Sequence, residues 1–403
     1  MSRVNAVELR RFLFDRLGLS GAPWPAEAAA DKALDLGMIQ IDSIRSTGLR
    51  NHELAWLARS DQPVSALYDL MYRTGRLLES HYPLFATRRD WLPMLGSGLN
   101  DVSAGHRAAR RRYRPLMGRL VDQMRRDGPV TVAQFSARRV PGGFNTIKAT
   151  TKALELLFHD RAVQIAGRTA NFHRIFDLTE RIAPELNAPS PIDDDAYERF
   201  LLESALTVLK IATADQIADR VALHFGSWRG ESIHRWRALT ARLLPELARS
   251  VTVVDFPGQP EYWYRPADEA AWHHMGNPDG FARLVAPLDN LLFSRRRFSA
   301  LFGFDYKFEA YTPVERRRFY FAMPIAHDSD IVGLVDGKLD REGAKPVWRI
   351  TGLELSKPVP VEALRAGIHR IARLAGAERV AVATSTTRAL RQALTGDCGP
   401  RGE

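Results

Sequence analysis

The sequence contains a single cysteine, Cys398, close to its C-terminal end. One cysteine cannot form an intrachain disulfide, a multi-cysteine zinc site or a cysteine-ligated iron–sulfur cluster. No stretch approaches the roughly 18 apolar residues of a membrane-spanning helix, and no signal segment begins the chain. The His-Glu-x-x-His, Walker A and Gly-x-Gly-x-x-Gly motifs are also absent. We therefore expect a cytoplasmic protein with no metal, no cofactor and no membrane partner.

Positive charge is what the chain has in excess. Its 403 residues include 57 Lys and Arg against 47 Asp and Glu, a net charge of +10, and arginine supplies nearly all the cations. Arginine binds phosphate bidentately and stacks on bases, so nucleic acid is the first partner to consider. With 45% apolar residues, the chain is long enough for two to four compact units.

The order of apolar periods and turn signals predicts an α+β protein. Residues 114–184 follow the order of three helices and a β-hairpin, the plan of a winged helix, and residues 197–264 repeat it. Alternating runs at 308–311, 318–324, 331–338 and 347–354 predict strands, with a hairpin at 325–331. The predicted parts are an N-terminal winged-helix-like domain (1–112), a second (113–192) and third winged helix (193–266), and a β-rich C-terminal domain (267–403).

The segment Leu36–Ile44 contains the clearest candidate site. Gln40 and Asp42 stand two residues apart among apolar neighbours, and in a strand they would face the same side. An Asp before Ser also often caps a helix, so the pair alone is a weak signal. Four basic side chains follow within 20 residues: Arg45, Arg50, His52 and Arg59. A carboxylate followed by basic groups suits a site that binds a phosphate polymer and stabilises an electron-poor carbon.

Several blocks together resemble the winged-helix DNA glycosylases of the AlkZ/YcaQ type. The blocks occur in order over about residues 36–350, which makes them more specific than any one motif. They are Gly37–Ile44, Gly167-Arg168 with Arg174–Pro184, Ala286–Arg297 with Leu301–Tyr306, Arg317–Pro324, and Val332–Lys338. The Gln-x-Asp form places the chain with the branch associated with alkylated purines and the unhooking of interstrand cross-links.

The resemblance implies tandem winged helices and a β-rich domain arranged around duplex DNA, with Gln40 and Asp42 as the catalytic pair. It implies double-stranded DNA as the partner of a monomeric, nucleoid-associated enzyme. The side chains that we expect at the DNA are those of Arg45, Arg50, His52, Arg59, Arg168, Arg295, Arg296, Arg297, Arg317, Arg318 and His327. The Glu-x-Trp-x-His-Glu segment typical of the family is replaced here by Glu79–Phe85, which bears on the range of substrates.

The two catalytic residues fit hydrolysis of an N-glycosidic bond. A purine alkylated at N7 or N3 is already cationic and leaves without protonation. An ionised Asp42 would oppose the positive charge that develops at C1′ and accept a proton from water, and Gln40 would hold that water. No Lys is placed for Schiff-base chemistry, so we expect a monofunctional glycosylase.

Two other functions remain open from the sequence. A non-catalytic winged-helix transcription regulator would also be basic, but it would have no use for Gln40 and Asp42. A self-resistance glycosylase for a bulky natural-product adduct would suit the altered Glu79–Phe85 segment. We see no aromatic box beside Gln40 and Asp42, so we expect a groove approach to the lesion, with the 325–331 hairpin and His327 at its tip holding the DNA.

Overall fold

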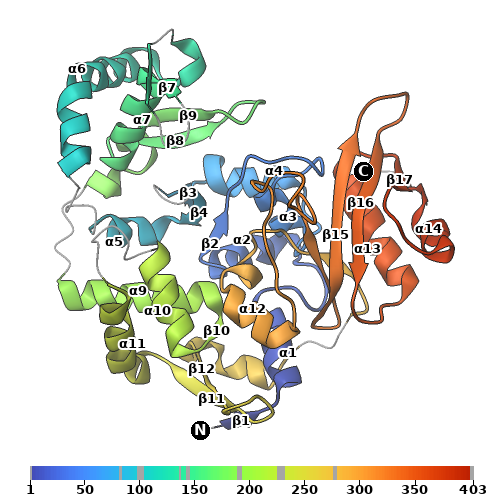
Figure 1. The fold of residues 1–403 in the computed structure, drawn as a ribbon. Coiled ribbons are helices and arrows are strands. Elements are labelled where there is room, and N and C mark those ends of the chain that lie inside the picture. The colour runs from blue at the N-terminus through green and yellow to red at the C-terminus, as the bar shows by residue number, and fades with distance from the viewer. Residues whose placement is uncertain are drawn as a thin grey trace. The chain divides into compact units, whose positions relative to one another are not determined.

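The computed structural model describes residues 2–80, 84–97, 104–135, 138–141, 146–187, 193–224, 232–275 and 279–399. The chain forms two compact units, shown as a ribbon in Figure 1. Unit 1 comprises Met1–Val64, Leu202–Arg220 and Arg237–Glu403, and unit 2 comprises Ser65–Leu201 and Val221–Trp236. Each unit is described by itself.

Unit 1 contains a six-stranded sheet of order β13-β14-β15-β16-β17-β18. All neighbours are antiparallel except β16 and β17, which are parallel and joined through helix α13. Buried Leu364, Ile368 and Ile371 form the inward face of that helix. The strands are β13 (Arg283–Leu284), β14 (Met323–His327), β15 (Asp330–Asp340), β16 (Val347–Leu355), β17 (Arg379–Val382) and β18 (Gly396–Asp397), with α13 (Val361–Leu374) and α14 (Arg388–Leu394).

A second sheet of unit 1 brings the start of the chain next to its middle. Its order is β1-β11-β12-β10, and β1 (Ser2–Val4) pairs in parallel with β11 (Arg249–Val253). Helix α1 (Ala6–Arg16) is fixed by a capping box of Asn5 and Glu8, and its Phe12 ring stacks on Trp272 at 4.1 Å. The other elements are β12 (Glu261–Tyr264), β10 (Ile211–Ala212), α2 (Ala26–Asp35), β2 (Met38–Gln40), α3 (Asn51–Leu57) and α12 (Arg295–Phe302).

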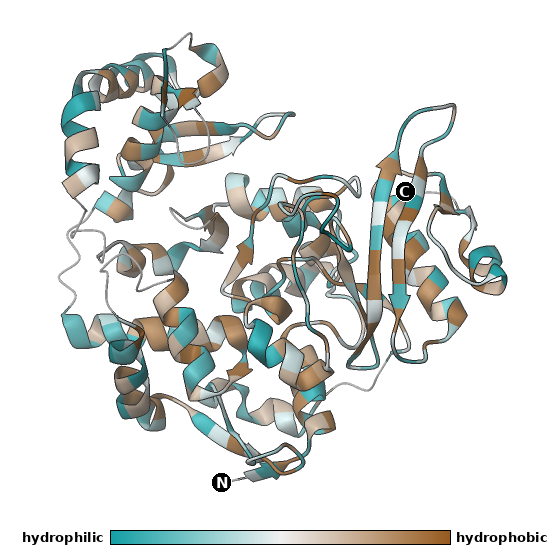
Figure 2. Ribbon diagram, viewed as in Figure 1, coloured by the Kyte–Doolittle hydropathy of each residue, from teal (hydrophilic) through white to brown (hydrophobic). Residues whose placement is uncertain are grey.

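Unit 2 packs helices α6 (Ala104–Asp127) and α7 (Ala149–His159) on a three-stranded sheet of order β5-β9-β8. Leu120, Met124, Leu154 and Phe176 belong to its buried core. Figure 2 shows that α6 is hydrophilic over much of its length, as expected for a helix that buries only a narrow stripe. The remaining elements are β5 (Val130–Thr131), β6 (Arg139–Pro141), β7 (Thr146–Lys148), β8 (Val163–Arg168), β9 (Arg174–Leu178), α8 (Thr179–Ile182), β3 (Leu77–Glu79), β4 (Phe85–Arg88), α4 (Val64–Tyr68) and α5 (Leu92–Ser97).

Three helices have residues in both units. They are α9 (Asp194–Leu209), α10 (Ala214–His224) and α11 (Ile233–Leu247), and they correspond to the three helices of the plan predicted for residues 197–264. The α+β class and the β-rich C-terminal sheet are confirmed. The four domain boundaries stay predictions.

Three predicted elements differ from the structure. The second helix of the plan predicted for residues 114–184 would begin at Thr131 and run to Arg138. The structure has only a single 3₁₀ turn there, Val132–Gln134, because the chain then becomes extended and Arg139–Pro141 pairs with Thr146–Lys148. The strand expected at 308–311 is irregular, and the strand expected at 318–324 is irregular up to Ala322, with only Met323 and Pro324 extended as the start of β14. The backbone N–H groups of Arg318 and Phe319 bind the Glu309 carboxylate and not a neighbouring strand.

Candidate active site

The motif segment leaves helix α2 through a left-handed glycine. Gly37 has φ of 79°, which a residue with a Cβ adopts only at a cost, and β2 follows at once. Met38, Ile39 and Ile41 are 2–3% exposed and anchor the segment in the core. The strand ends at Gln40, so Asp42 lies in the irregular segment that follows it.

Asn51, at the start of α3, holds the motif backbone. Its side-chain amide donates to the Gln40 carbonyl at 2.7 Å, and its Oδ1 accepts the Leu288 N–H at 2.8 Å. Asn51 is fully buried, so neither bond competes with water. Asn290 adds a second tie by donating to the Leu36 carbonyl at 3.0 Å. The sequence singled out neither asparagine, although Asn290 lies inside the block Ala286–Arg297 and Asn51 follows the basic residue Arg50.

Asp42 is a half-buried carboxylate with little to neutralise it. Its Oδ1 accepts the N–H of Ile44 at 2.7 Å, a local turn contact. Burial raises the pKa of Asp42, and the Ile44 bond opposes that rise only in part. Within the described ranges, no Lys, Arg or His forms an ion pair with Asp42. Its charge is therefore available to a ligand.

One tyrosine, Tyr311, is close enough to Asp42 for the two groups to interact electrostatically, although the sequence showed no aromatic box there. Partial burial and the negative charge of Asp42 raise the pKa of Tyr311, with a smaller effect of Tyr320. Tyr311 is 79% exposed, and its ring packs edge-on against Phe308, so most of the ring is open to solvent. Both rings come from the irregular 308–322 segment, which the strand prediction had concealed.

A cavity of about 450 Å³ lies in this part of unit 1. Arg317 is at its wall, with its guanidinium 4.7 Å from the centre of the Tyr320 ring. Asp336 is 5% exposed and accepts the Tyr320 N–H at 2.7 Å, and burial raises its pKa. The cavity is lined by Ser46, Val314, Arg317, Arg318, Phe319, Tyr320, Asp336, Gly337, Lys338 and Thr351.

Three predicted DNA contacts are buried in the core of unit 1. Arg59 is 1% exposed and binds Asp289 through two bonds of 2.7 and 2.8 Å, and it also donates to the Leu17 and Ala55 carbonyls. Arg297 is 0% exposed and donates to four main-chain carbonyls. His52 is 0% exposed. A phosphate cannot reach these groups, so the structure gives them a structural role.

Three further arginines are partly engaged within the protein. Arg50 pairs with Glu53 at 3.1 Å, and Arg295 lies half-buried with its guanidinium 4.4 Å from the centre of the Tyr306 ring. In unit 2, Arg168 binds both carboxylate oxygens of Glu79, at 2.8 and 2.6 Å. Each of these arginines could contact DNA only through the guanidinium N–H groups that are not already bound within the protein.

Four predicted arginines keep accessible charge. Arg45 and Arg296 are exposed, and the nearest acidic group to Arg296 is Asp219 at 3.6 Å. Arg317 is half-buried at the cavity, and Arg318 is exposed and paired with Glu354.

His327 does not stand at the tip of its hairpin. The β14–β15 hairpin is confirmed, but its turn consists of Asp328 and Ser329, both with positive φ, as in a two-residue type I′ turn. His327 ends β14, is 9% exposed and lies 3.4 Å from the Asp328 carboxylate. Its burial argues against a role as a probe of the groove.

No helix in the described ranges is both long enough and apolar enough to cross a membrane. The segment Glu79–Phe85, on which the self-resistance alternative depends, is only partly described, because residues 81–83 lie outside the described residues.

Comparison with known proteins supports the reading of the motif blocks. The fold resembles that of the Streptomyces sahachiroi DNA glycosylase AlkZ with a TM-score of 0.58 and 14% sequence identity, over 94% of this chain and 99% of that one. At this identity the likeness shows the fold alone. The family model described as DNA glycosylase AlkZ-like matches residues 33–391, which include Gln40 and Asp42. The chain therefore belongs to the AlkZ-like family of DNA glycosylases.

Proposed function

We propose that this chain is a monofunctional glycosylase that hydrolyses the N-glycosidic bond of cationic N7- and N3-alkylated purines in duplex DNA. It would act as a monomer on the nucleoid and need no cofactor at Gln40 and Asp42. The observation that carries the proposal is the carboxylate of Asp42, which is half-buried and has no ion-pair partner within the described ranges. A fold gains nothing from such a group, whereas a reaction that develops positive charge does.

The mechanism follows from the charge and from its surroundings. As the bond to the cationic purine breaks, positive charge develops on the deoxyribose at C1′, and an ionised Asp42 stabilises it across a short, partly desolvated distance. The same carboxylate accepts a proton from the attacking water. Gln40 is held through its carbonyl by Asn51, so its side-chain amide starts from a fixed backbone and can orient that water.

The surroundings of Asp42 also favour a bulky lesion. Tyr311 is exposed beside the carboxylate, so a purine could stack on one open face without entering a closed box. An adduct or cross-link could then extend away from the protein. We therefore propose that unhooking of cross-links belongs to the same activity. The regulator alternative fits less well, because it leaves the charge of Asp42 without a purpose.

The function is tested with matched duplexes. One carries a single N7-methylguanine, and the other carries a neutral 7-methyl-7-deazaguanine of nearly the same shape. We expect abasic sites, revealed by alkali, only on the first, because the neutral base is a poor leaving group. Equal excision of both bases, or of neither, would contradict the proposal.

Borohydride provides the second arm of this experiment. Lys338 lines the cavity that Ser46 and Tyr320 also line, and an amine that attacked C1′ would leave a trapped covalent complex. We expect no trapped complex from a hydrolytic enzyme. A trapped complex that disappears in Lys338→Met would show a bifunctional enzyme in place of the monofunctional one.

A further inference from the structure

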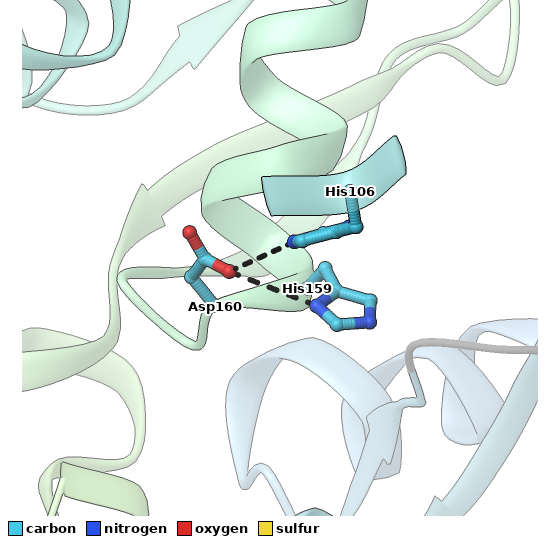
Figure 3. Close-up of side chains that lie close together, drawn as sticks. All are labelled: His106, His159 and Asp160. Carbon is cyan, nitrogen blue, oxygen red and sulfur yellow. Dashed lines mark hydrogen bonds and ion pairs between the residues drawn. The ribbon is translucent and has the colours of Figure 1, made fainter. Parts of the chain in front are cut away.

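Two histidines and an aspartate meet in unit 2 at a place that the glycosylase mechanism does not use. His106 lies in the first turn of α6, His159 is the last residue of α7, and Asp160 follows it. Figure 3 shows the two imidazoles and the carboxylate directed toward one another. Their side chains are only 13–19% exposed, which is low for three polar groups at helix ends.

The distances between their ligand atoms resemble those of a coordination sphere. His106 Nε2 lies 3.3 Å and His159 Nδ1 lies 3.7 Å from the same oxygen, Asp160 Oδ1. All three atoms lie within 4.8 Å of one another. Tetrahedral zinc with bonds of about 2.0–2.1 Å separates its ligand atoms by roughly 3.3–3.4 Å. Both histidine–carboxylate distances are therefore close to that spacing.

Arg110 leaves the shared oxygen open. Its guanidinium binds the other carboxylate oxygen, Asp160 Oδ2, at 2.8 Å. In metal sites, the oxygen of a ligating carboxylate that does not face the ion is commonly held by such an outer donor. The same contact would also satisfy the carboxylate without an ion. The two possibilities differ in whether His106 and His159 are ligands or merely hydrogen-bonded neighbours.

We propose that His106, His159 and Asp160 bind one Zn²⁺ ion that fastens the start of α6 to the end of α7. Two imidazoles and a carboxylate are a donor set that suits zinc, and the fourth position would be filled by water. The ion would stabilise unit 2, whereas Gln40 and Asp42 belong to unit 1. This differs from the expectation of no metal drawn from the sequence, where the His106 to His159 separation gave no compact motif.

The test uses the full chain without a histidine tag, stripped with chelator and dialysed against micromolar Zn²⁺. We expect about one equivalent of retained zinc and a rise in melting temperature on adding the metal. His106→Ala and Asp160→Asn should each weaken zinc binding at least tenfold and abolish that rise. The matched control is His173→Ala, an exposed histidine in the β8–β9 turn of the same unit, which should bind zinc like the wild type.

The absorption spectrum of bound cobalt tests the site in the wild-type protein, without relying on the folding of a variant. Co²⁺ bound by two imidazoles and a carboxylate in a tetrahedral site absorbs strongly in the visible range, and zinc should bleach that absorption. Arg110→Met should keep the cobalt spectrum if the ion is bound by the histidines. The proposal is overturned if the wild type retains no zinc at micromolar concentration, or if zinc is retained equally after His106→Ala and His159→Ala.

Discussion

Unit 1 contains two aspartates that differ in how the protein compensates the charge of the carboxylate. Asp289 is 1% exposed, receives two bonds from the equally buried Arg59 and caps the N–H of Leu291. Asp42 is half-buried and accepts one bond, from the N–H of Ile44, with no ion pair in the described ranges. The first carboxylate is fully compensated and holds the fold together. The second is left with uncompensated charge, as expected of a group that meets a developing cation.

The largest expected effect on stability comes from breaking the compensated pair. Arg59→Met leaves Asp289 charged and buried without its partner, which should lower the free energy of unfolding by about 3–5 kcal/mol. Chemical denaturation monitored by circular dichroism measures the loss, and adding Asp289→Leu should recover part of it. The control is Arg296→Met, whose side chain is 69% exposed and should cost no more than about 1 kcal/mol. Similar losses for both variants would erase the proposed distinction between structural and surface arginines.

The sequence could not separate those arginines. Residues 295–297 are three consecutive arginines at the start of α12, where successive side chains point about 100° apart. Arg297 therefore enters the core with Phe298, Arg296 faces solvent and Arg295 lies between. Which arginine is buried depends on main-chain carbonyls from distant segments. A run of three arginines does not indicate where those carbonyls lie.

The proposed catalytic pair stands out from the sequence more clearly than its surroundings do. Gln40 and Asp42 stand out because polar side chains interrupt an apolar run, a signal local to the sequence. Asn51 is bonded to the distant Leu288, and Tyr311 interacts electrostatically with the distant Asp42, so neither relation is visible in the local sequence. Tyr311 was further hidden because 308–311 alternates like a strand, whereas Glu309 holds the chain in an irregular path by binding backbone N–H groups.

A smaller effect is expected from the neutral member of the pair. Gln40→Ala removes a hydrogen bond to water but no charge, so the single-turnover excision rate should fall about tenfold. Gln40→Glu serves as a sharper variant, because it adds a second carboxylate that can still hold water. A loss in Gln40→Ala as large as that of an Asp42 variant would mean that the amide, and not the charge, dominates catalysis.

The pH dependence of excision should follow the ionisation of Asp42. Burial raises the pKa of this carboxyl, so its active, charged form is lost at a higher pH than that of an exposed aspartate, about 3.9. The single-turnover rate on N7-methylguanine should thus fall as pH drops through the raised pKa and be level above it. Circular dichroism at each pH checks that the protein stays folded. A rate that is flat down to pH 4 in folded protein would contradict an ionised Asp42.

The smallest expected effect concerns the accessible charges. Each phosphate contact contributes roughly −0.9 to the log–log slope of duplex affinity against salt. Arg296→Ala should flatten the slope by about that amount if this exposed side chain binds one phosphate. Arg59→Met, measured where it remains folded, should leave the slope unchanged. A flattened slope for Arg59→Met alone would show that the buried arginine reaches DNA after all.

The central claim is that the uncompensated charge of Asp42 drives excision, and its most direct test is Asp42→Asn. The variant keeps the shape of the side chain, so the Kd for a duplex with one N7-methylguanine should stay within about threefold of the wild type, because phosphate contacts dominate binding. The single-turnover excision rate on the same duplex should fall at least about 10²-fold. A rate within a few-fold of the wild type, at unchanged Kd, would contradict the account and move the catalytic role away from Asp42.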